Sequence, residues 1–366
     1  MVEINAMKKS LILILLLIAF TGCRERFEGF DFQSHSEKLV IEAVLTDHTE
    51  LGYIRVSYTE PVNGNEIRDF IPEEGATILV SDDQGNEFSF FSEGNGLYAN
   101  PTFSPVFGRQ YRMQVQVGDN RYESDWQALP SAQPPAIDVQ YRPDTAQIIN
   151  NVGRPMNDLT VTLSDKVVKG HENSYTYWSF VYYYIYDAYG QPDILDLLPD
   201  AKRFCYVQDT EWPRLTIHKD QFVEGRADSE YRLDVSSVPY NEKLIYDYAV
   251  HVIKYSISES IHDYFGLIAE QLDNDGGVFD AAPSSIPGNF TQVSGSLDVL
   301  GYFGVFNASE QRVFFNQSEL PYRKMSLPTS AADCPGHHAV DLDNTCFNCT
   351  SVASPFNTII KPAWWR

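Results

Sequence analysis

The sequence predicts a mainly β protein, in which an N-terminal antiparallel, immunoglobulin-like β-sandwich is followed by a larger β-rich domain with one clear amphipathic helix. The chain of 366 residues contains 22 Tyr, 22 Phe and 5 Trp, and aromatic residues are enriched in strands. Short runs that alternate apolar and polar residues recur along the chain, with turn residues at intervals of about ten residues. A single segment carries apolar residues at clear helical spacing.

The first 22 residues form a secretion signal. Lys8 and Lys9 precede an apolar run over 11–20, which is too short to span a bilayer as a helix. A cysteine, Cys23, follows the small residue Gly22, and this arrangement indicates a bacterial lipoprotein whose mature chain begins at a lipid-modified Cys23. An ordinary cleaved signal with a chance cysteine is the alternative. Residues 23–36 are then a lipidated polar tether that holds the protein at a membrane.

Residues 37–133 carry the pattern of the β-sandwich. The strand faces are formed by alternate apolar residues: Leu39, Ile41 and Ala43 in one segment, and Tyr111, Met113, Val115 and Val117 in another. Runs rich in Asp, Asn and Gly, at 82–86 and 118–120, predict the turns. The prolines at 130, 134 and 135 predict the boundary.

Residues 134–366 form the β-rich C-terminal domain, which ends in a cysteine-containing tail. Long apolar and aromatic strands are expected over 175–186 and 246–257, and a hairpin is expected to pair 299–306 with 312–315 across 307–310. The helix is predicted after the N-cap residue Ser258, and its apolar stripe consists of Ile261, Phe265, Ile268 and Leu272.

Composition and motifs argue against two classes of function. With 50 acidic and 27 basic residues, the net charge of −23 would repel a phosphate backbone, so nucleic acid is not an expected partner. The chain has no G-x-S-x-G or phosphate-loop motif, and His171-Glu172 lacks the second histidine of a metalloprotease because residue 175 is Tyr. No catalytic residue, enzymatic activity or cofactor is therefore predicted.

Four cysteines besides Cys23 are candidates for disulfides. Cys205, Cys334, Cys346 and Cys349 are an even number in a chain with an export signal, and their three possible pairings stay open. The spacing Cys346-x-x-Cys349 is also that of zinc ligands. The alternative to disulfides is therefore a zinc site, with the donor set Cys334, His337, Cys346 and Cys349.

The aromatic strand over 175–186 has two interpretations. Its even-numbered face carries Trp178, Tyr182, Tyr184 and Tyr186. Such a face either packs in the core or forms a surface for a glycan, a peptide or a protein partner, because Tyr and Trp combine a large apolar ring with a polar group.

The chain also resembles a known family, domain-of-unknown-function family 4249. The resemblance is carried by the order of several short segments: the lipoprotein start, Leu39-Val40-Ile41-Glu42-Ala43, Gly75-Ala76-Thr77-Ile78, Gly276-Gly277-Val278-Phe279-Asp280, Pro287-Gly288-Asn289, Cys346-Phe347-Asn348-Cys349 and Lys361-Pro362-Ala363-Trp364-Trp365. The family is typical of Bacteroidota and is implied to consist of outer-membrane lipoproteins whose genes often lie beside a TonB-dependent transporter. It has no assigned catalytic residues.

The resemblance implies a lipid-anchored outer-membrane protein, on the periplasmic or the cell-surface face. Its expected function is that of a binding or accessory partner of a TonB-dependent transporter barrel in nutrient uptake. Two alternatives stay open: an envelope-anchored hydrolase that acts on glycan or peptide, and a purely structural envelope protein.

Overall fold

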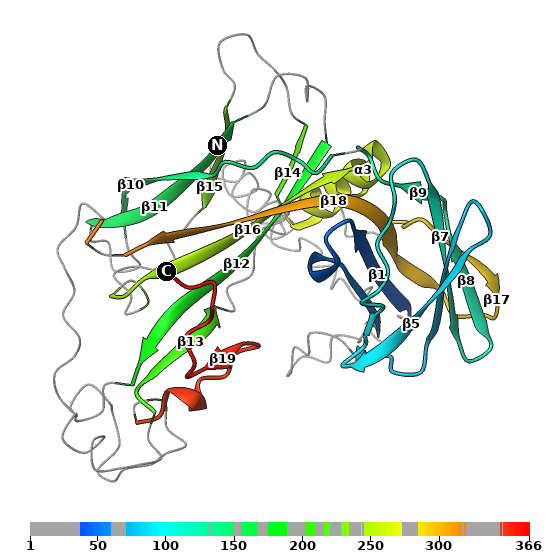
Figure 1. The fold of residues 1–366 in the computed structure, drawn as a ribbon, viewed down its shortest axis with the longest axis horizontal. Coiled ribbons are helices and arrows are strands. Elements are labelled where there is room, and N and C mark those ends of the chain that lie inside the picture. Colours follow the sequence, from blue (N-terminus) through cyan, green and yellow to red (C-terminus); the bar gives the residue numbers. More distant parts are fainter. Residues whose placement is uncertain are drawn as a thin grey trace, which may run out of the picture.

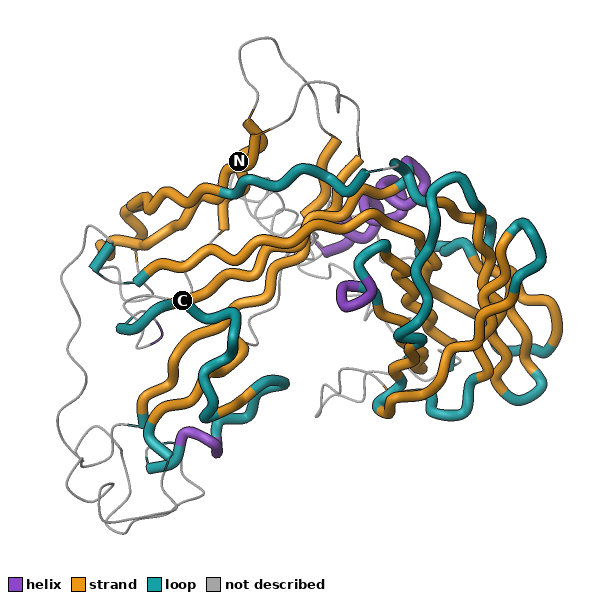
Figure 2. Tube along the Cα trace, viewed as in Figure 1, coloured by secondary structure: helices purple, strands orange, loops and turns teal. Residues whose placement is uncertain are grey.

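Strands dominate the fold (Figures 1 and 2). The computed structural model describes residues 37–59, 71–131, 133–149, 155–166, 175–188, 202–209, 216–219, 228–233, 243, 245–272, 285–316, 318–319, 345 and 347–366. The protein is mainly β, as predicted, and the α-helix of these described residues is α3 (Glu259–Leu272). The immunoglobulin-like character of the N-terminal sandwich stays a prediction. The signal, Cys23 and the tether lie outside the described residues.

The N-terminal lobe is built from short strands around one apolar core. Its elements are β1 (Leu39–Thr46), η1 (Thr49–Leu51), β2 (Tyr53–Tyr58), β3 (Ile71–Pro72), β4 (Thr77–Asp82), β5 (Glu87–Gly94), β6 (Leu97–Ala99), β7 (Gln110–Val117), β8 (Asn120–Ser124), β9 (Gln127–Ala128), β17 (Phe290–Ser294) and the first half of β18 (Val299–Phe315). The predicted alternation is confirmed, because Leu39, Ile41 and Ala43 of β1 and Met113 and Val115 of β7 all lie in this core.

β18 replaces the predicted hairpin. It is one continuous strand of 17 residues that pairs in parallel with β1 over 299–306 and antiparallel with β16 (Tyr248–Ile257) over 307–315. The hairpin prediction is wrong because the expected turn residues, 307–310, continue the strand and pair with β16. Asn307 donates to Asp47 Oδ2 at 2.8 Å, and Ala308 packs in a core.

One glycine permits the close approach of β18 to β1. Gly301 has a φ of +101°, a region that L-residues rarely adopt. A Cβ at this position would lie 2.0 Å from the carbonyl oxygen of Ile41. No larger residue fits here without moving one of the two strands.

The C-terminal lobe consists of the remaining strands of the large sheet and of one small separate sheet. Its elements are β10 (Gln140–Ile149), β11 (Pro155–Lys166), β12 (Tyr175–Asp187), β13 (Phe204–Asp209), β14 (Thr216–Lys219), β15 (Asp228–Leu233), β16, α3, the second half of β18, η5 (Cys349–Ser351) and β19 (Asn357–Thr358). The order in the large sheet continues β1-β18-β16-β12-β13-β19, while β10, β11 and β15 form the separate sheet.

Both faces of β16 are covered, because all ten of its residues are buried. On one face, Val139 and Tyr141 pack against the cluster that contains Val250 and Phe315. On the other face lies α3, which buries Phe265 against Tyr177 and Tyr302. The helix therefore packs against strands of both lobes.

The predicted helix is confirmed with one difference. Ser258 Oγ accepts a hydrogen bond from Ile261 N at 3.4 Å, as expected of an N-cap, and Ile261 and Phe265 are buried. Leu272, the last residue of the predicted stripe, is 68% exposed. It lies in the final turn of the helix, where the apolar stripe leaves the core.

The two lobes share strands. β17 pairs with β8, and β18 adds Phe303 and Val305 to the N-terminal core. The predicted domain boundary near residue 133 stays a prediction. Residues of β18, far beyond this boundary in the sequence, complete the core of the N-terminal lobe. Among the described residues, no helix combines the length and the apolar composition that crossing a bilayer requires.

Candidate functional site

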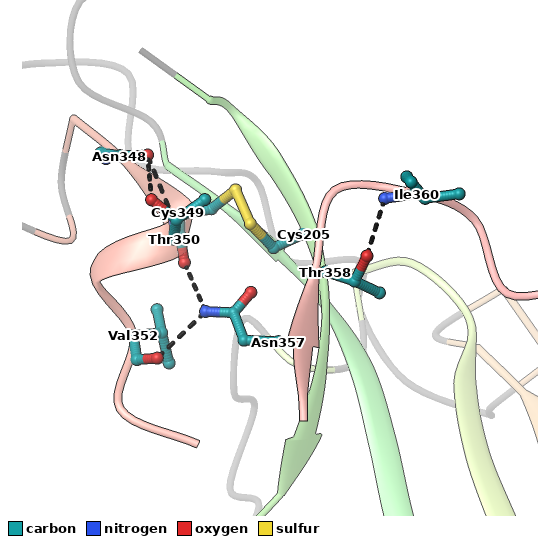
Figure 3. The surroundings of a disulfide bond; sticks show 8 residues. All are labelled: Cys205, Asn348, Cys349, Thr350, Val352, Asn357, Thr358 and Ile360. Carbon is teal, nitrogen blue, oxygen red and sulfur yellow. Dashed lines mark hydrogen bonds between the residues drawn. A yellow bond between two sulfur atoms is a disulfide. The ribbon is translucent and has the colours of Figure 1, made fainter. Parts of the chain in front are cut away.

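A disulfide joins the tail to the edge of the large sheet (Figure 3). Cys205 of β13 and Cys349 of η5 are bonded, with a Cα–Cα distance of 5.5 Å across 144 residues of sequence. Both cysteines are fully buried. Asn357 holds the loop around the disulfide, because its Nδ2 donates to the carbonyl oxygens of Cys349 and Val352 at 3.0 Å each. The tail is thus attached covalently and by hydrogen bonds.

This bond bears on the other cysteine predictions. It selects one pairing for Cys205 and Cys349, and it speaks against the zinc alternative, because an oxidised Cys349 cannot supply a thiolate ligand. Cys334, His337 and Cys346 lie outside the described residues. Among the described residues, no three His, Cys, Asp or Glu side chains are grouped as metal ligands.

The aromatic strand β12 contributes mainly to the core. Trp178 is 1% exposed and Tyr184 is 7% exposed, and both belong to one apolar cluster with Tyr248 and Phe315. Tyr182 and Tyr186 are half-buried and pack against that cluster. These positions favour the core interpretation over a broad aromatic surface, and Tyr182 and Tyr186 are the more accessible of the four side chains.

The opposite face of the same sheet is covered by the two tryptophans of the tail. Trp364 lies 4.9 Å from Tyr183 between ring centroids, and the Arg312 guanidinium stacks over Trp364 at 5.0 Å. Trp365 packs edge-on against Phe314 of β18 at 5.7 Å. From the sequence, the two tryptophans contributed only to the family resemblance, because the local sequence does not indicate which strands the tail will cover.

A polar cluster adjoins Trp364 on this face. His251 Nε2 of β16 lies 2.5 Å from Glu310 Oε2 of β18, and Arg312 NH1 lies 3.4 Å from Glu310 Oε1. His251 is buried, whereas the side chains of Glu310 and Arg312 are 28% and 26% exposed. We call His251, Glu310, Arg312 and Trp364 the polar strip. The alternation of β16 and β18 creates it, and sequence reasoning missed it because its residues come from different segments.

Electrostatics sets the charge state of the strip. Burial lowers the pKa of His251, and Arg312 lowers it further against the opposing effect of Glu310. Burial alone would raise the pKa of Glu310, but His251 and Arg312 outweigh burial and lower it. At neutral pH the strip therefore contains a neutral imidazole, a carboxylate and a guanidinium.

The strip offers polar and aromatic groups that suit binding. Among the described residues, the side-chain hydrogen bond of His251 is made with Glu310. A partly exposed carboxylate and guanidinium beside an indole ring offer hydrogen bonds and stacking to a ligand or partner.

Comparison with known proteins gives one match. A family model described as "Domain of unknown function (DUF4249)" matches residues 28–312. Neither the curated proteins nor the solved structures contain a match to this chain.

Proposed function

We propose that this chain, which belongs to the DUF4249 family of unknown function, is a lipid-anchored outer-membrane protein that acts as a binding or accessory partner of a TonB-dependent transporter in nutrient uptake. In this proposal Cys23 carries the lipid, and the two lobes stand outside the cytoplasm. The polar strip is the surface that we assign to a glycan, peptide or barrel contact, and half-buried Tyr182 and Tyr186 lie on the other face of the same sheet.

One observation carries the export part of this proposal. The disulfide between Cys205 and Cys349 supports export, because disulfides are typical of oxidising compartments and cytosolic thiols are kept reduced. It agrees with the signal pattern that precedes Cys23. The acidic composition further suits an exported, well-solvated protein. The choice of a TonB-dependent transporter as the partner rests on the family resemblance. No observation among the described residues favours a hydrolase or a purely structural protein.

Co-purification from outer membranes tests the partner. Affinity-tagged protein with its native signal is extracted in mild detergent, and the bound proteins are identified by mass spectrometry. We expect a TonB-dependent transporter barrel in amounts comparable to the bait. Recovery of the bait without any barrel would contradict the proposed partnership.

A matched variant tests the anchor separately. Cys23→Ala removes the sulfur at the signal junction and alters no residue of the two lobes. We expect this variant in the soluble envelope fraction, whereas the native protein stays with membranes. Unchanged membrane retention of Cys23→Ala would contradict lipid anchoring at this residue.

A further inference from the structure

A pocket opens at the edge of the N-terminal lobe, and its lining comes from β17, the start of β18 and the residues just before β1 and β17. Its volume is ≈ 380 Å³, within the range of about 300–1,000 Å³ that is usual for small-molecule sites. Its polar lining residues are Lys38, Ser285, Gln292 and Asp298, and its apolar lining residues are Pro287, Val299 and Leu300. It lies on a different lobe from the polar strip.

Gln292 is a polar residue on the inward face of its strand. It pairs with Tyr122 of β8, which is fully buried, and Phe290 two residues earlier packs against the same core. Paired residues in adjacent strands point to the same face of a sheet, so the Gln292 side chain points into the lobe. An apolar residue would be expected at this position.

The amide of Gln292 has an unused donor. Its Nε2 is buried and has no hydrogen-bond partner among the described residues. A buried donor without an acceptor is unfavourable, and such a group in a native fold needs an explanation. Gln292 lines the pocket, so a ligand that offers an oxygen there would satisfy Nε2 once the side-chain amide turns towards the pocket.

The other polar groups around the pocket are only loosely engaged with one another. Lys38 Nζ lies 3.4 Å from Ser285 Oγ and 3.7 Å from Asp298 Oδ2, which leaves the ammonium with spare donors. The Asp298 side chain is 65% exposed and can accept hydrogen bonds. One positive and one negative charge balance, so the pocket favours a neutral ligand with both donors and acceptors.

We infer that this pocket binds one monosaccharide unit, either free or at the end of a glycan. The hydroxyl groups of a sugar ring match the mixed donors and acceptors of Gln292, Lys38 and Asp298. The C–H face of the ring matches the apolar wall of Pro287, Val299 and Leu300. This inference adds a ligand class to the proposed function. It rests on the proposed function for the idea that the bound sugar is a nutrient.

The test is ligand-observed saturation-transfer NMR on the purified mature protein. The probes are glucose, galactose, mannose and N-acetylglucosamine, each as the free sugar and as its methyl glycoside, which represents the end of a glycan. We expect at least one sugar to bind with a dissociation constant in the millimolar range. Binding of the free sugar alone would assign a free monosaccharide, and binding of the glycoside as well would assign a glycan end.

Variants locate the bound sugar. Gln292→Leu removes the unused donor and should weaken binding by about tenfold. Asp298→Ala, at a largely exposed side chain, should weaken it without affecting the fold. Gln116→Leu, at an exposed position of β7, is the matched control and should bind like the native protein. Thermal melting of each variant confirms that it is folded.

Two results would overturn the inference. Absence of binding by all eight probes would mean that the pocket holds only solvent, and equal binding by Gln292→Leu and the native protein would place the sugar elsewhere. Either result is distinct from failure of the proposed function, which is decided by whether a transporter barrel co-purifies. If the barrel co-purifies but no sugar binds, the sugar inference alone is contradicted and the proposed partnership stands.

Discussion

Asp82 determines the geometry of the turn between β4 and β5. Its carboxylate accepts hydrogen bonds from the backbone N–H groups of Gln84 at 3.0 Å and Asn86 at 2.8 Å, and from Asn86 Nδ2 at 2.8 Å. Arg109 forms an ion pair with the same carboxylate. Burial would raise the pKa of Asp82, but these contacts outweigh burial and lower it to about 2.

Asp82 should therefore make stability depend on pH in a definite window. Because its pKa is lower in the folded protein than in the unfolded chain, the stabilisation is complete above about pH 4 and is lost as the pH falls towards 2. Asp82→Asn should lower the urea midpoint at pH 7 and flatten its decline over that window. Urea unfolding of both proteins, followed by circular dichroism at several pH values, measures the difference.

Asp83→Asn is the control for this prediction. Asp83 is the exposed neighbour in the same turn, so this variant should keep both the midpoint and the pH dependence of the native protein. Equal effects of the two substitutions would show that net charge, and not the contacts of Asp82, is responsible.

At the residue scale, the local sequence pattern identified the chemical role of a residue better than it identified which other residues it contacts. The Asp82-Asp83-Gln84-Gly85-Asn86 turn lies where its residues predicted it, and Gly85 has the φ of +83° that favours glycine. The cysteines were recognised as disulfide candidates, but only the fold brings Cys205 next to Cys349. The polar strip could not be predicted, because His251 of β16 and Glu310 of β18 are 59 residues apart and Trp364 comes from the tail.

Among the elements, the C-terminal tail has the least regular structure of its own. In its described part, the strand β19 has two residues and η5 has three. Its order comes from three attachments: the Cys205–Cys349 disulfide, the pairing of β19 with β13, and the two tryptophans on the sheet. Isolated segments of this length have no stable structure in water, so the attachments determine the conformation of the tail.

Loss of the disulfide should therefore destabilise the protein strongly. A cross-link that closes a loop of this length is expected to contribute about 3–5 kcal/mol. Cys205→Ala, Cys349→Ala and the double variant should lose the same free energy of unfolding, because each removes one and the same bond. Urea unfolding without reductant measures these losses, and excess reductant should bring the native protein to the level of the variants.

Additive losses in the double variant would contradict the pairing. Peptide mapping without reduction provides an independent check, since it should recover the peptides that contain Cys205 and Cys349 as one linked species.

At the scale of the whole molecule, β18 connects the two lobes as one strand. It contributes Phe303 and Val305 to the N-terminal core and Val313 and Phe315 to the C-terminal one. Asn307, at the change of partner strand, accepts from Ser131 N at 3.0 Å and donates to Asp47. A continuous strand with a buried polar junction resists independent movement of the lobes.

The N-terminal segment should consequently not fold alone. A fragment of residues 37–133 lacks β17 and β18, so β1 loses its parallel partner and the core loses two fully or nearly fully buried side chains. We expect this fragment to give a poorly dispersed NMR spectrum and no cooperative thermal transition. The mature full-length chain, measured under the same conditions, is the control. A well-dispersed spectrum of the fragment would show that the sandwich is autonomous.

The sequence by itself determined the class of the fold, the alternating faces of β1 and β7, the start of α3 and the family, because these depend on periodicity, capping and the order of short segments. It also indicated export, which stays a prediction. Only the tertiary structure decided that β18 is one strand, that Cys205 bonds to Cys349, and that Gln292 lines a pocket. Each of these depends on contacts between segments that are distant in the sequence, and local periodicity contains no information about which distant segments will meet.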